Sequence, residues 1–188
     1  MNAIELLANR VTGVHGALVG LVADAATVDW ATPVRPGTSP VGLTLWHVPR
    51  TQDWLVNTCV RGGEEVADRP EFAALPDPDV FGFGTGLSPE QASTAAAGVK
   101  PDLLLDYADA VRADIVSWLG ELSETDLDVP ATDFMGRQQR RPAYCTEAAL
   151  EEVAHLPDLP VGVLLLRPVM SHVLMHLGEV DTLVQLAR

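Results

Sequence analysis

Apolar residues recur at intervals of three and four along several long segments of this chain. In residues 3–26 the apolar stripe consists of Ile4, Leu7, Val11, Val14, Leu18, Leu21 and Ala25. Residues 101–121 repeat the pattern, and two further apolar segments cover 40–61 and the end of the chain from between Val161 and Pro168. This spacing is typical of amphipathic helices. Because no stretch alternates apolar and polar residues as a half-buried strand does, the sequence predicts an all-α fold.

Local signals mark where these helices begin and end. Ser39 and Pro40 in "TSP" fit the N-cap and first position of the second long helix, and "GG" at 62–63 should end it. Pro49 lies within that helix, so we expect a kink or a frayed first turn. "SPEQ" at 88–91 is a capping-box sequence that opens a short helix.

The connections between the long helices differ in length. Residues 62–87 look irregular, and 123–160 form a long link with one short helix from Thr146 to about Ala154. A long link can cross a bundle, whereas a short one joins antiparallel neighbours. We therefore expect a four-helix bundle in up-down-down-up order with long crossover connections. A chain of 188 residues, 47% of them hydrophobic, fits a single domain spanning residues 1–188. The run "FGFGTG" is not a phosphate loop, because no strand precedes it and no Lys-Ser/Thr follows.

The overall charge limits the partners of the chain. A net charge of −14 with only 12 Lys and Arg argues against a nucleic-acid binder, which must neutralise phosphates. The one basic cluster contains Arg137, Arg140 and Arg141. It fits a solvated loop that balances nearby acids, or a mouth that attracts an anionic substrate.

The sequence indicates a cytoplasmic location. No apolar stretch reaches the roughly 20 residues that cross a bilayer, so we expect no membrane partner. The N-terminus carries an acidic residue where a signal peptide would be basic. Cys59 and Cys145 make no disulfide framework and should both be thiols. Bundles of this kind often form homodimers, although no patch in the sequence identifies an interface.

Three histidines stand out in apolar surroundings. The C-terminal segment reads "HVLMHLGE", with His172 and His176 four positions apart and therefore on one face of a helix. His47 lies in the apolar segment "LTLWHV" of the second long helix. Each could be a satisfied core histidine, but two imidazoles at this spacing can bind one cation, and a third would complete a ligand set. Three neutral imidazoles leave coordination positions of a divalent ion open, as in catalytic sites.

Glu179 and Gly178 follow the histidine pair. Glu179 lies three residues after His176 and can face the same direction. It could accept a hydrogen bond from a ligand ring, act as a general base, or be a surface carboxylate. Gly178 is unfavourable within a helix, so we expect another helix to approach closely there.

The sequence leaves alternative roles open for several other residues near these segments. Arg50 could reach a substrate carboxylate or be solvated, and His155 could close over a site or be an ordinary loop residue. His15 is expected at the boundary of the core. Trp54 and Trp118 are expected in the core, with the alternative that either lines a pocket.

Two short stretches, "LWH" in the second helix and "SHVLMHLGEVDTL" at the C-terminus, resemble the DinB-like superfamily. That group includes mycothiol-dependent maleylpyruvate isomerase N-domains and bacillithiol transferases. The resemblance implies an up-down-down-up bundle and a divalent metal, commonly nickel or zinc. At matching positions the metal ligands would be His47, His172 and His176.

The leading functional hypothesis is therefore a metal-dependent thiol S-transferase or isomerase. A small cellular thiol would bind the metal as thiolate and attack a small-molecule electrophile, and Glu179 would assist. One Lys against eleven Arg suggests a GC-rich genome, which favours mycothiol as the thiol. Two alternatives stay open: a non-catalytic metal-binding bundle for stress response or interaction, and a metal-assisted hydrolase with Glu179 as general base.

Overall fold

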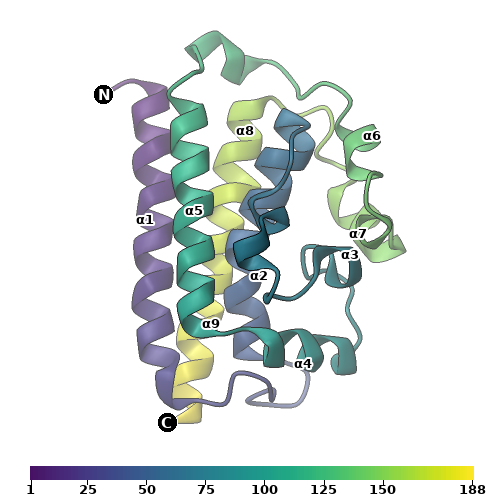
Figure 1. Cartoon of the computed structure of the whole chain (residues 1–188). Helices are drawn as coiled ribbons and strands as arrows, with labels where there is room; N and C mark the ends of the chain where they lie inside the picture. The colour runs from purple at the N-terminus through teal and green to yellow at the C-terminus, as the bar shows by residue number, and fades with distance from the viewer.

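The computed structural model describes all residues, 1–188, and is entirely helical (Figure 1). It contains no β-strand, and only an isolated bridge joins Pro130 to Pro160. The predicted all-α class is confirmed. The chain has more helical segments than the four long and two short helices expected, because the connections contain further short helices and 3₁₀ turns and two of the long helices include a π segment.

Long helical segments form the frame of the molecule. They are α1 (Ala3–Asp24), α2 (Val41–Asp53) with its continuation η2 (Trp54–Arg61), α5 (Pro101–Leu119), and the C-terminal run α8 (Val161–Leu166), η7 (Arg167–His172) and α9 (Val173–Ala187). The shorter α-helices are α3 (Pro78–Phe81), α4 (Pro89–Gly98), α6 (Phe134–Gln138) and α7 (Glu147–Val153). Single 3₁₀ turns are η1 (Ala25–Thr27), η3 (Val66–Asp68), η4 (Pro70–Phe72), η5 (Glu124–Asp128) and η6 (Pro142–Tyr144).

The long helices pack around one apolar core. Helix α1 contacts α5 and α9, and α2 contacts α5 and α9 from the other side. Figure 1 shows these helices roughly parallel, with α3, α6 and α7 grouped beside α2. Buried apolar side chains form one cluster that extends from Leu7 to Val184. Much of the predicted stripe of α1 is buried, although Ile4 and Leu21 lie at its edge. The up-down-down-up order of helix directions stays a prediction.

Several of the predicted helix boundaries are found. Ser88 caps α4 and forms the capping box with Gln91, and Thr146 caps α7. Gly62 ends η2 in the left-handed conformation, with φ of 69°. The start of α2 differs from the prediction by one residue, because Pro40 rather than Ser39 is the N-cap and no side chain caps this end.

The two long helices with a proline in their interior change to π-helical geometry near that proline. Helix α2 runs through Pro49 without a frayed first turn, because every residue from Val41 onward is buried, and it becomes π-helical from Trp54. In the last helix the π segment η7 contains Pro168. A proline has no N–H for the carbonyl four residues earlier, which locally weakens α-helical bonding.

Two helical stretches, Ala3–Thr27 and Val161–Ala187, reach the length and mean hydropathy of a membrane span. This corrects the expectation that no segment is long enough. Within their most apolar windows, 28% and 44% of the residues are buried inside the fold. A bundle helix that buries one apolar stripe passes the same test, and both stretches belong to helices that pack in the core.

Candidate metal centre

The three predicted histidines meet between α2 and the C-terminal helix. His47 lies on α2, His172 is the last residue of η7, and His176 is in the first turn of α9. The Nε2 atom of His172 is 3.4 Å from that of His47 and 3.2 Å from that of His176. One ligand atom from each residue lies within 4.8 Å of the others, so the cluster could hold a metal ion.

The spacing of the three nitrogens suits a divalent cation. Imidazole nitrogens bound at 2.0–2.1 Å in tetrahedral geometry are about 3.3 to 3.4 Å apart. The two Nε2–Nε2 distances, 3.4 and 3.2 Å, are close to that value. A ring nitrogen must be unprotonated to bind metal, so the protonation of each ring decides whether the cluster fits.

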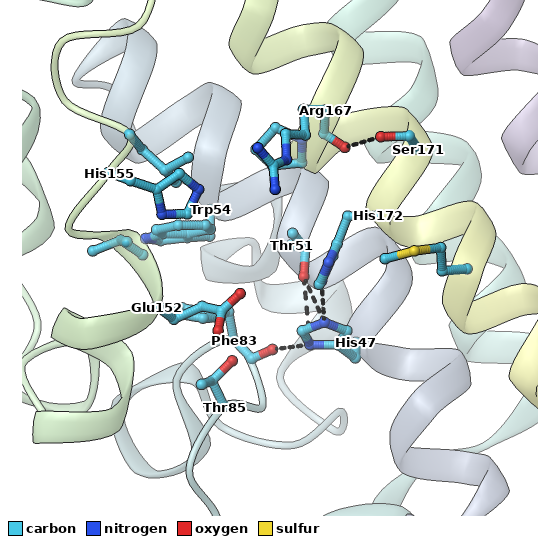
Figure 2. Close-up of a pocket in the computed structure, with 14 residues that line it drawn as sticks. His47, Thr51, Trp54, Phe83, Thr85, Glu152, His155, Arg167, Ser171 and His172 are labelled. Carbon is cyan, nitrogen blue, oxygen red and sulfur yellow. Dashed lines mark hydrogen bonds between the residues drawn. The ribbon is translucent and has the colours of Figure 1, made fainter.

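His47 presents an unprotonated Nε2 to its neighbours. Its Nδ1–H donates to the carbonyl oxygen of Phe83 at 2.5 Å, which leaves the lone pair on Nε2 (Figure 2). Burial of the ring, reinforced by His176, lowers the pKa of His47 to about 3. Burial and His176 also lower the pKa of His172. A neutral imidazole has one unprotonated ring nitrogen, so His172 offers Nε2 to a cation when its own proton is on Nδ1.

Glu179 orients the third ring. Its Oε2 atom is 3.2 Å from Nδ1 of His176, so the carboxylate accepts the Nδ1–H and Nε2 faces the other histidines. Of the three predicted roles, this geometry matches the hydrogen-bond acceptor. It also places Glu179 on the side of the ring away from the cluster. The expected close approach at Gly178 is wrong, because an added Cβ would meet nothing within 4 Å.

The glycine-rich run 81–86 supports His47, a role that sequence reasoning missed. Gly82, Gly84 and Gly86 all have positive φ, which turns the loop back on itself. A Cβ on Gly84 would lie 3.1 Å from Nδ1 of His47, so only glycine allows the loop this close. The signal in the sequence was the alternation of glycines in this run, which does not identify the residue that the loop contacts.

Two cavities border the cluster. One of about 220 Å³ is lined by His47, Thr51, Trp54, Phe83 and His172, together with residues of α7 and η7 (Figure 2). A second of about 210 Å³ is lined by His47, His172 and His176. Glu152 lines both cavities, a position that sequence reasoning did not single out. Both cavities therefore reach His47 and His172.

Both predictions for Arg50, a solvated side chain or a contact to a substrate carboxylate, are wrong. The side chain is fully buried and bonds Asp53 at 3.2 Å, Glu65 at 2.6 Å and the hydroxyls of Tyr107 and Tyr144. Burial disfavours its charge, but Glu65 and the other neighbours outweigh it and raise the pKa of Arg50. Burial raises the pKa of Asp53 and of both tyrosines. The sequence shows that Asp53 follows Arg50 by three residues, a spacing that allows an ion pair within one helix. It does not show that Glu65, Tyr107 and Tyr144 also contact Arg50.

The arginine cluster of α6 and the following turn is structural. Arg137 donates to the carbonyl oxygens of Cys59 and Val60, and Arg140 donates to that of Gly62, so both cap the end of η2. Arg141 pairs with Asp68 and Asp79. This matches the reading in which the cluster balances nearby acids, with the addition that it closes a helix end.

The remaining candidates are divided between core and cavity. Trp54 is buried and also lines the larger cavity, and His155 lines the same cavity. Trp118 is partly buried against the core. His15 lies at the core boundary, as predicted, with Nε2 3.7 Å from Asp109. Both cysteines are free thiols, as expected.

Comparison with known proteins identifies the family of this chain. No curated protein matches the chain. The family model of the DinB superfamily matches residues 10–155, which is more than half of the chain and includes His47 and the glycine-rich loop. The match ends before the C-terminal histidine pair, so the convergence of the pair with His47 is an independent observation from the structure. The chain belongs to the DinB superfamily.

Proposed function

We propose that this protein is a metal-dependent thiol S-transferase or isomerase. His47, His172 and His176 would hold a divalent metal, nickel or zinc, and a low-molecular-weight thiol, mycothiol in particular, would be the co-substrate. The observation that supports this most is the convergence of three ring nitrogens beside two cavities. A bound divalent metal with an open position lowers the pKa of a thiol and so supplies a thiolate near neutral pH.

The residues of the chain have distinct tasks in this proposal. The Phe83 carbonyl and Glu179 fix the tautomers of His47 and His176, so that each offers Nε2. Glu152 lines both cavities, and in this proposal it would take up the proton that the thiol releases. Trp54 and Phe83, stacked with centroids 4.2 Å apart, give the cavity an apolar wall for the electrophile. Glu179 assists through His176 and does not contact the substrate.

The proposal also includes the setting of the site. Residues 1–188 would form one domain whose long helices run up-down-down-up, in a cytoplasmic protein that acts on small molecules and binds neither nucleic acid nor membrane. Reducing conditions in the cytoplasm keep a co-substrate thiol available. A homodimer is compatible with the proposal, and sedimentation of the purified protein would establish the state.

Two other functions would give different results in the same assay. A non-catalytic bundle needs no route to the metal, whereas both cavities reach His47 and His172. Hydrolysis with Glu179 as general base needs its carboxylate near a metal-bound water, but this carboxylate contacts the opposite nitrogen of His176. These observations favour thiol transfer.

The test is to load the purified protein with nickel or zinc and measure conjugation of mycothiol and simpler thiols to a panel of electrophiles. His176→Ala, which removes one ligand, is the control. We expect conjugation that requires the metal and is lost in the variant. A rate no higher than that of the metal-free protein, for every thiol and electrophile, would contradict the proposal. Hydrolysis without thiol that is lost in Glu179→Gln would support the hydrolase instead.

A further inference from the structure

The larger cavity contains a cation that no other residue neutralises. Arg167 lines this cavity together with His47 and His172, and its side chain makes no ion pair or hydrogen bond within the chain. Arg50, Arg61, Arg69, Arg112, Arg141 and Arg188, by contrast, pair with carboxylates. Arg10, Arg35, Arg137 and Arg140 also lack a carboxylate partner, but Arg167, whose side chain is exposed, is the one arginine that lines either cavity beside the histidines.

The π-helical segment explains how Arg167 and His172 share this cavity. In an α-helix of 3.6 residues per turn, two residues five positions apart point about 140° away from each other. The i→i+5 bonding of a π-helix places residues five apart nearly above one another. Arg167 and His172 are the first and last residues of η7. The π geometry therefore turns the guanidinium and the imidazole toward the same space.

The other walls of the cavity complete a site with three regions. The histidine cluster lies at one end, and Trp54, Phe83 and Leu156 supply apolar surface. Glu152, the acidic residue that lines this cavity, forms no ion pair. Figure 2 shows it apart from Arg167, with Trp54 and His172 at intermediate heights in the view. An anionic group would be repelled by Glu152 and attracted to Arg167. The polarity of the cavity thus sets the orientation of a charged ligand.

We propose that Arg167 is a specificity residue that binds the carboxylate of a ligand whose reacting group lies at the histidine cluster. A planar guanidinium forms two parallel hydrogen bonds to a carboxylate, which fixes both position and orientation. The site therefore selects small amphipathic carboxylates with an apolar middle section. This inference rests on the proposed function, and the carboxylate belongs either to the thiol or to the electrophile.

The experiment uses the cobalt(II)-loaded protein, in which thiolate binding to the metal is followed by its charge-transfer absorption. Mercaptopropionate is compared with mercaptopropanol, which has the same length without the charge. Phenylacetate is compared with phenylethanol by calorimetry, which requires no thiol. The variants are Arg167→Gln, Arg167→Lys and the matched control Arg10→Gln, which removes an equal charge from an exposed arginine of α1.

We expect the wild-type protein to bind at least one of the two carboxylates about tenfold more tightly than its neutral partner. Arg167→Gln should abolish that preference and Arg167→Lys should retain part of it, while Arg10→Gln behaves as wild type. A preference confined to mercaptopropionate assigns the carboxylate to the thiol, and one confined to phenylacetate assigns it to the electrophile.

Equal binding of charged and neutral probes, or a preference that survives in Arg167→Gln, would overturn the inference. Failure of the proposed function gives a different pattern, in which no thiol produces the charge-transfer absorption. The calorimetric comparison of phenylacetate with phenylethanol then still decides the role of Arg167.

Discussion

Gly84→Ala tests whether the glycine-rich loop holds His47 in place. Gly84 has φ of 96°, and the added Cβ would lie 3.1 Å from Nδ1 of His47 and 3.4 Å from the ring of Trp46. Gly37 offers a matched control, because its φ of 84° is nearly the same and a Cβ there would meet nothing within 4 Å. The two substitutions share the backbone strain, and only one of them presses on the metal cluster.

The two effects have separate magnitudes. A left-handed conformation costs an alanine roughly 1–2 kcal/mol relative to glycine, so both variants should lose about that much free energy of unfolding without metal. In Gly84→Ala the new methyl group also displaces His47 from the Phe83 carbonyl, which holds its tautomer. Changes to such supporting contacts typically cost about 10–100-fold in metal affinity. Gly37→Ala should keep the affinity of the wild-type protein.

Urea unfolding of the metal-free proteins measures the strain, and competition with a chelator measures the zinc affinity. We predict a loss of stability in both variants, at least as large in Gly84→Ala as in Gly37→Ala, and a loss of zinc affinity in Gly84→Ala alone. If Gly84→Ala bound zinc as tightly as Gly37→Ala, the loop would have no part in orienting His47. If both variants lost affinity equally, general destabilisation would explain the effect.

Three further predictions concern the same region. Arg50→Met leaves two buried carboxylates without their cation and should lower the free energy of unfolding by about 3–5 kcal/mol, measured in urea; a change below about 1 kcal/mol would show that the carboxylates are neutral. Glu179→Gln should weaken zinc binding about tenfold in chelator competition, since the amide is a poorer acceptor for His176, whereas a plain surface carboxylate would give no change. The pKa of His47 is lowered to about 3 in the folded protein. Between pH 6.5 and 3, the imidazole is therefore protonated in the unfolded chain and neutral in the folded one. The stability of the metal-free protein should therefore fall as the pH drops from 6.5 toward 3, by up to about 1.4 kcal/mol per pH unit, and urea titrations of His47→Gln should show a flatter dependence.

The helices could be predicted because their signals are local. The stripe of α1, the capping box at Ser88 and the stop at Gly62 each depend on residues within a few positions of one another. The His172–His176 pair is local in the same sense, since helical spacing alone puts both rings on one face. The meeting of this pair with His47 depends on the packing of α2 against α9, which only the family resemblance suggested. In the fold, one ligand atom from each of the three rings lies within 4.8 Å of the others.

The rest of the site depends on contacts between distant segments. A charged residue such as Arg50 is usually exposed to solvent. In the fold it is surrounded by Glu65, Tyr107 and Tyr144, which come from three different segments. The loop at 81–86 contacts His47 across 36 positions of chain. No periodicity or cap encodes such contacts, so reading along the sequence could assign neither the buried cation nor the carbonyl that orients the ligand.

These two unpredicted features are themselves connected. Nε of Arg50 donates to the carbonyl of Gly82 at 3.3 Å, and the next residue in the loop, Phe83, provides the carbonyl that His47 binds. Arg50 follows His47 on α2 by three residues, so the helix that carries the ligand also carries the cation that anchors its supporting loop. A shift of α2 would therefore move ligand and support together and preserve the bond between them. The buried charge cluster, costly to desolvate, is explained better as a means of fixing this loop than as a source of stability.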